Sequence, residues 1–173
     1  MTNDLERVLE PPYLEDLASL DDAELRSRRH ESQQVEAKLS YLRRLVQGRL
    51  DIVSAEIDRR ATGGTGGDLS DLVARLPEIL ADRVRAPGPG RMPTNLVPPD
   101  DEDLTVELDE VSGPGALGAL PDLPDAELRA VAGRLRDLEQ RVSSQRRQVF
   151  DVIDALQAEL TGRYEQSDRD HAT

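Results

Sequence analysis

The chain lacks cysteine and tryptophan, and its 173 residues include only one phenylalanine and three tyrosines. Without cysteine, disulfides and thiolate metal sites are excluded. With so few aromatic side chains, neither a large globular core nor a large apolar pocket is expected. Charged residues make up 33% of the sequence, and the apolar residues are mostly Leu, Val and Ala. This balance is typical of long amphipathic helices.

Long apolar runs are also missing. A membrane-spanning helix needs about 18 consecutive apolar residues, and no segment of the sequence comes close. The opening residues, MTNDLERVLEPPYLEDL, are acidic where a signal peptide would be basic. We therefore expect a soluble, cytoplasmic protein without a membrane anchor.

Residues suited to catalysis are scarce. The only histidines are His30, interpreted as a plain surface residue, and His171, in a tail that is expected to be disordered, so neither a histidine metal site nor a catalytic triad is expected. No GxxxxGK[ST] phosphate loop occurs, and the glycines of ATGGTGG at 61–67 indicate only a flexible run. The sequence therefore favours a protein that is not an enzyme and holds no metal.

The charge is strongly negative overall but unevenly distributed. A net charge of −13 argues against general DNA or RNA binding, which depends on Lys and Arg neutralising phosphates. Residues 100–110 hold seven carboxylates and no base, whereas residues 24–60 hold nine bases against six acids. The acidic tract is interpreted as a solvated linker, with imitation of nucleic acid toward a basic partner as the alternative. The locally basic segment could receive an anionic ligand.

Two segments of the chain repeat each other. Residues 20–60 align without a gap with residues 123–163, and about fifteen of the forty-one paired positions are identical. Each copy begins with an aspartate before AEL, at Asp22 and Asp125, which is a helix-start signal. Each copy is predicted to form one helix of up to about 40 residues.

Three regions are expected from this organisation. Residues 1–62 hold an N-terminal segment, with a short helix around 12–20, and the first long helix. Residues 63–122 form a flexible acidic and Pro/Gly-rich linker with a short helix near 68–85. Residues 123–173 hold the second long helix and a frayed tail.

Both copies carry an apolar stripe with spacings of three and four residues, the pattern of a coiled-coil seam. The fold class is therefore predicted to be all-α, a long antiparallel two-helix coiled coil with a shorter middle helix. The seam residues are Val35, Leu39, Leu42, Val46, Leu50, Val53 and Ile57 in the first copy, and Leu128, Val131, Leu135, Leu138, Val142, Gln145, Val149, Ile153, Leu156 and Leu160 in the second.

A polar pattern flanks each seam on the same side. Its steps of 4, 3, 4 and 4 residues keep five side chains within about 80° of one helical face, over about 22 Å of axis. Two antiparallel copies can bring these flanks onto a common face, whereas parallel copies cannot. The pattern comprises Glu36, Ser40, Arg43, Gln47 and Asp51, and then Glu139, Ser143, Arg146, Phe150 and Asp154.

These residue types suit a phosphorylated, guanine-like ligand. Arginine can stack on a purine, hold guanine O6 and N7, or pair with phosphate, and a carboxylate can accept from guanine N1 and N2. The alternative is an ordinary solvated helix flank with surface ion pairs. Recurrence at the same phase in both halves favours the ligand.

The pattern E-x3-S-x2-R-x3-Q-x3-D, complete in the first copy, resembles that of the RsiG family of actinobacterial anti-sigma factors. The resemblance implies an antiparallel coiled coil of two motif-bearing helices that binds a dimer of cyclic di-GMP. It also implies that the loaded protein holds the sporulation sigma factor WhiG away from RNA polymerase. The residues implied to contact the nucleotide are Glu36, Ser40, Arg43, Gln47, Asp51, Glu139, Ser143, Arg146 and Asp154.

The second copy departs from the family pattern because Phe150 stands where Gln is expected. Phe150 could stack on a base or be buried on another element. We favour apolar packing with a lost hydrogen bond and leave this residue out of the predicted site. A ligand-independent helical adaptor or structural coiled coil is the alternative function for the whole chain.

Overall fold

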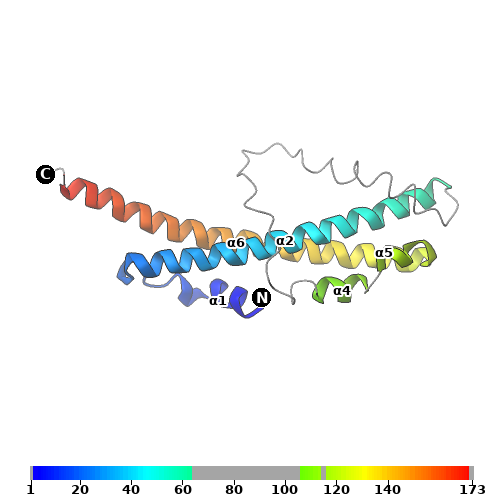
Figure 1. Cartoon of the computed structure of the whole chain (residues 1–173), viewed down its shortest axis with the longest axis horizontal. Coiled ribbons are helices and arrows are strands. Elements are labelled where there is room, and N and C mark those ends of the chain that lie inside the picture. The colour runs from blue at the N-terminus through cyan, green and yellow to red at the C-terminus, as the bar shows by residue number, and fades with distance from the viewer. Residues whose placement is uncertain (1, 64–105, 114–115, 172–173) are drawn as a thin grey trace. The chain divides into compact units, whose positions relative to one another are not determined.

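The computed structural model describes residues 2–63, 106–113 and 116–171, and every regular element among them is helical (Figure 1). Two helices are long and the others are short. In chain order the elements are α1 (Thr2–Leu9), η1 (Pro11–Tyr13), η2 (Leu17–Ser19), α2 (Asp22–Ala61), α4 (Val106–Ser112), α5 (Ala116–Ala119), η4 (Leu120–Asp122) and α6 (Asp125–His171).

The chain divides into two compact units, and both long helices contribute to each. Unit 1 comprises residues 1–40 and 143–173, and unit 2 comprises residues 41–142. In unit 1 the beginning of α2 pairs with the end of α6, and in unit 2 the end of α2 pairs with the beginning of α6. Both pairings are antiparallel, so the predicted fold class is confirmed.

The start of α2 shows how the sequence sets a helix boundary. The side chain of Asp21 accepts a hydrogen bond from the backbone N–H of Glu24 at 2.7 Å, which satisfies one of the unpaired donors of the first turn. The capping residue is therefore Asp21, one position before the predicted Asp22, which is the first residue of α2.

The apolar seams form the core of both units. All predicted seam residues are buried except Ile57 and Gln145, which are half-buried. The core also includes Leu25, Ala132 and Val152, which the predicted seams omit. Each long helix therefore buries a somewhat broader stripe than a strict coiled-coil seam, since a third element packs beside it in each unit.

In unit 1 the third element is the N-terminal segment. Leu5 and Val8 of α1 are buried, and Tyr13 of η1 is 8% exposed. The Tyr13 hydroxyl donates to the backbone carbonyl of Arg28 at 2.9 Å, and Arg28 Nη1 donates in return to the Tyr13 carbonyl at 2.8 Å. Burial raises the pKa of Tyr13. These contacts fix the N-terminal segment on the first turns of α2.

In unit 2 the third element is α4. Leu108 is fully buried, and Arg49 of α2 donates from Nη1 to the Leu108 carbonyl at 3.2 Å and from Nη2 to Asp109 at 2.6 Å. Arg141 of α6 forms an ion pair with Glu107. The short helix α4 is thus bound to both long helices of its unit.

The two units are built from the same elements, 103 residues apart in the sequence. Adding this offset places α1 on α4, η2 on η4 and α2 on α6. Several contacts correspond as well: the pair Asp4–Lys38 of unit 1 has its counterpart in Glu107–Arg141 of unit 2. The internal duplication therefore covers the short elements in addition to the two long helices.

Three expectations for the connecting segments need correction or lie beyond the description. The helix expected around 12–20 is absent: the helix is α1, which ends at Leu9, and η1 and η2 follow it. The acidic tract is not only linker, because residues 106–110 belong to α4, and part of the Pro/Gly-rich stretch after it forms α5 and η4. The helix expected near 68–85 lies outside the described residues.

Candidate functional site

In unit 1, the polar flanks of α2 and α6 meet at Arg146. Its Nε donates to Glu36 Oε1 at 2.8 Å and to Ser40 Oγ at 2.7 Å. Ser40 in turn donates to Glu36 Oε1 at 2.6 Å. Three motif residues from both copies therefore form one hydrogen-bonded cluster.

The remaining motif positions of unit 1 lie on α6, before and after Arg146. The Arg146 guanidinium carbon lies 4.7 Å from the centroid of the Phe150 ring, which is a cation–π contact. Phe150 is half-buried and Asp154 is exposed. Ser143 lies one turn before Arg146 and is half-buried.

In unit 2, the corresponding cluster centres on Glu139. Its Oε1 accepts from Arg43 Nε at 3.0 Å and from Gln47 Nε2 at 2.9 Å. Asp51, one turn after Gln47 on α2, is half-buried. The pairs Glu36–Arg146 and Glu139–Arg43 are thus the same interaction, made once in each unit.

Both clusters remain accessible to solvent. The side chains of Glu36 and Arg146 are 19% and 32% exposed, and those of Glu139 and Arg43 are 24% and 35% exposed. An ion pair at this exposure contributes about 0–1 kcal/mol to folding. The pairs are therefore weak enough for a bound ligand to replace them at small cost.

The short helices lie on the other flank of the seam. Lys38 follows Glu36 by two residues, about 200° around the helix, and Lys38 contacts Asp4 of α1. Arg49 follows Gln47 by two residues in the same way and contacts Asp109 of α4. In each unit the ion pair to the third element therefore lies on a different side of α2 from the motif side chains.

The motif resemblance agrees with an independent comparison. The model of a family described as RsiG-like matches residues 11–80 and 114–173. The chain belongs to the RsiG-like family. No curated protein matches it. Membership in the RsiG-like family implies an anti-sigma factor that binds cyclic di-GMP, and it implies that the protein is not an enzyme.

The described part of this RsiG-like chain contains neither a metal-binding cluster nor a membrane-spanning helix. None of its histidine and carboxylate side chains cluster in a way that could hold a metal ion. Among the same residues, no helix has the length and apolarity required to cross a bilayer.

One contact of the motif residues differs from the sequence-based expectation. We expected Phe150 to pack as an ordinary apolar side chain, but its ring lies against Arg146, a motif residue. The sequence spacing is consistent with this contact, because Arg146 and Phe150 are four residues apart and such residues are neighbours on a helix surface. The replacement of the family's Gln by Phe indicates a lost hydrogen bond and does not by itself predict a contact with Arg146.

Proposed function

We propose that the chain is an anti-sigma factor that binds cyclic di-GMP through its two motif copies. When loaded, it sequesters a sporulation sigma factor similar to WhiG from RNA polymerase. The proposed contacts to the nucleotide are Glu36, Ser40, Arg43, Gln47, Asp51, Glu139, Ser143, Arg146 and Asp154. The observation that supports this proposal best is the repeated Arg–Glu cluster, made from one residue of each copy in both units.

The chemistry of the clusters suits this ligand. Cyclic di-GMP carries two phosphates and two guanines, so it needs cationic forks together with carboxylates that accept from guanine N1 and N2. Arg43 and Arg146 supply the forks, and Asp51 and Asp154 supply carboxylates about two turns further along the same helices. The paired glutamates keep the arginines in place before the ligand arrives.

Ligand and sigma factor are thermodynamically linked in this proposal. If the loaded chain binds the sigma factor more tightly by some factor, the sigma factor strengthens nucleotide binding by the same factor. A fall in cyclic di-GMP then releases the sigma factor. The cytoplasm, where sigma factors act, is the location that this function requires.

The site assignment is tested by calorimetry with cyclic di-GMP on the full chain. Arg43→Ala and Asp51→Ala are each expected to weaken binding at least tenfold, a loss of about 1.4 kcal/mol or more, without a change in helicity. The matched controls are Arg141→Ala on α6 and Asp109→Ala on α4, each of which removes one partner of an ion pair between a long helix and α4. Unchanged affinity in both site variants would contradict the assignment.

The function itself is tested by size-exclusion chromatography with the sigma factor. We expect a complex only when cyclic di-GMP is present. A complex that forms equally well without nucleotide would instead support a ligand-independent helical adaptor. Arg43→Ala should then behave like the wild type, because the polar flank would have no ligand to hold.

A further inference from the structure

The two motif copies hold their arginines by different means. In unit 2, Gln47 donates to Glu139, so an amide steadies the carboxylate that pairs with Arg43. In unit 1, Phe150 occupies the position equivalent to Gln47 and cannot donate. Its ring instead lies 4.7 Å from the guanidinium carbon of Arg146. At this motif position the side chain thus contacts the glutamate in unit 2 and the arginine in unit 1, where Glu36 accepts from Ser40.

The Arg146 guanidinium is held at its inner edge and open at its outer edge. Both of its hydrogen bonds come from Nε, to Glu36 and Ser40. Nη1 and Nη2 make no hydrogen bond to a described residue. The planar group therefore presents its terminal donors while an aromatic ring restricts its rotation.

Such an arrangement is suited to reading a flat or bidentate acceptor. A guanine edge with O6 and N7, or a phosphate with two oxygens, takes two parallel N–H donors from one guanidinium. Affinity depends on how much side-chain freedom is lost on binding, and a fork fixed beforehand loses less. The ring supplies this preorganisation without competing for the terminal donors.

We propose that Phe150 is a positioning residue of the nucleotide site, which fixes the plane of Arg146 by cation–π contact so that its terminal nitrogens meet cyclic di-GMP. This inference rests on the proposed function. It adds to the site a residue that the motif does not contain. It also distinguishes Arg146, which an aromatic ring contacts, from Arg43, whose glutamate partner accepts from the Gln47 amide.

The test is calorimetric affinity for cyclic di-GMP in variants of the full chain. Phe150→Leu keeps apolar bulk but removes the ring, and a cation–π contact at a partly exposed site accounts for a loss of about two- to fivefold. Phe150→Tyr keeps an aromatic face and should bind within about twofold of the wild type. Circular dichroism should show the same helicity in all three proteins. If Phe150→Leu fails to fold, Phe150→Met takes its place in the same comparison.

A double-mutant cycle separates positioning from other roles. On an Arg146→Gln background, Phe150→Leu should cause no further loss, because the arginine that it positions is gone. Equal losses on both backgrounds would mean that Phe150 contacts the base directly or only supports the fold, and would overturn the inference. Unchanged affinity of Phe150→Leu on the wild-type background would overturn it too.

The failure of this inference differs from failure of the proposed function. If Arg43→Ala weakens nucleotide binding but Phe150→Leu does not, the site stands and the positioning role is wrong. If the wild-type chain shows no affinity for cyclic di-GMP, the proposed function itself is wrong.

Discussion

Arg60 and Arg163 make the same set of interactions in the two units. Arg60 donates from Nη1 to the Leu123 carbonyl at 2.7 Å, and Arg163 donates from Nη1 to the Leu20 carbonyl at 2.7 Å. Each also binds the aspartate that begins a long helix, at Asp125 or Asp22. An arginine near the end of α2 thus binds the backbone just before α6, and an arginine of α6 binds the backbone just before α2.

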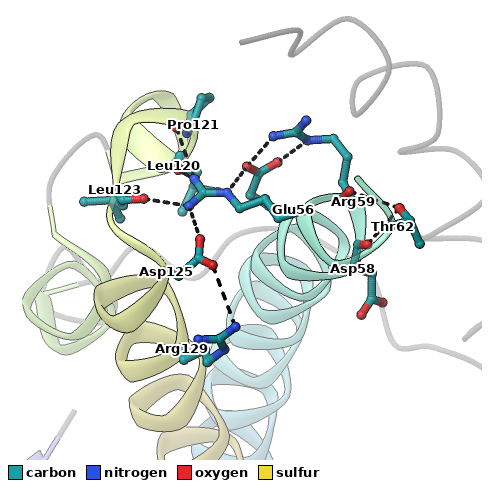
Figure 2. Close-up of polar contacts among 10 residues, drawn as sticks. Glu56, Asp58, Arg59, Thr62, Leu120, Pro121, Leu123, Asp125 and Arg129 are labelled. Atoms are coloured by element: carbon teal, nitrogen blue, oxygen red, sulfur yellow. Dashed lines mark hydrogen bonds and ion pairs between the residues drawn. The ribbon is translucent and has the colours of Figure 1, made fainter. Parts of the chain in front are cut away.

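Figure 2 shows this arrangement in unit 2, where Leu120, Pro121, Leu123 and Asp125 surround one guanidinium. Its Nη2 donates to the carbonyls of Leu120 and Pro121, as Arg163 Nη2 donates to those of Leu17 and Ala18 in unit 1. A lysine ammonium cannot reach this many acceptors in one plane.

We therefore predict that Arg60→Lys and Arg163→Lys each lower the midpoint of thermal unfolding by about 2–4 °C. Hydrogen exchange should accelerate most at η4 for the first variant and at η2 for the second, because those turns lose their carbonyl partners. Arg129→Lys is the control, since the Arg129 side chain is 67% exposed and its ion pair within the described residues is with Asp125. Equal effects in all three variants would contradict a specific role for the two arginines.

Glu56 predicts a pH dependence of stability. Its side chain is 4% exposed and accepts from Arg59 at 2.7 Å and 2.8 Å and from Arg60 at 2.7 Å (Figure 2). Hydrogen bonds from Arg59 lower the pKa of Glu56, with a further lowering from Arg60. The charged form is therefore stabilised by folding, and this stabilisation is present above the usual Glu pKa.

As the pH falls below the usual value of 4.5 and through the lowered pKa, the contribution of Glu56 is lost. Glu56→Gln should be less stable than the wild type at neutral pH, and the difference should shrink in acid. Urea unfolding at a series of pH values measures it. Glu165→Gln, which removes an exposed carboxylate of α6, serves as the control. A constant difference at all pH values would show that the charge of Glu56 is not responsible.

The long helices and their seams were predictable because they depend on periodicity alone. The burial of Leu39, Leu42 and Leu135 follows from spacings of three and four residues, and the antiparallel pairing follows from the side on which the polar flank lies. The extent of the duplication was predictable too but was overlooked. Leu5, Val8, Pro11, Leu14 and Leu17 recur as Leu108, Val111, Pro114, Leu117 and Leu120.

Other features depend on contacts between distant residues and could not be predicted from local patterns. The carboxylates around Leu108 suggest a solvated linker, yet one buried leucine and the Arg49 contacts are enough to form α4. Glu56 lies at a seam-like position and is buried only because two arginines neutralise it. The family resemblance predicts which residues contact the ligand, but the pairing of Arg43 with Glu139 and of Arg146 with Glu36 is visible only in the structure.

A substitution at Glu139 tests whether the polar cluster of unit 2 binds a ligand or is only a surface ion pair. Replacing it with Gln removes the charge that Arg43 and Gln47 share. Because the pair is partly exposed, we expect a change of less than about 1 kcal/mol in the free energy of unfolding. We expect at least tenfold weaker binding of cyclic di-GMP, since the site loses a contact and its arginine loses its orientation. Urea unfolding and calorimetry on the same sample measure both; a large stability loss with unchanged affinity would contradict the assignment.

The packing of α4 gives a final prediction. Its buried residues are Leu108 and Ser112, and Leu108 is fully buried. Leu→Ala at such a site costs about 2–5 kcal/mol, and a helix of seven residues is not stable in isolation. Leu108→Ala should therefore release α4, with loss of amide protection over residues 106–112 in hydrogen exchange. Val106→Ala, at a position that is 50% exposed, should leave that protection unchanged. If protection in Leu108→Ala equals that of the wild type, the polar contacts of Arg49 and Arg141 are sufficient to hold α4 in place.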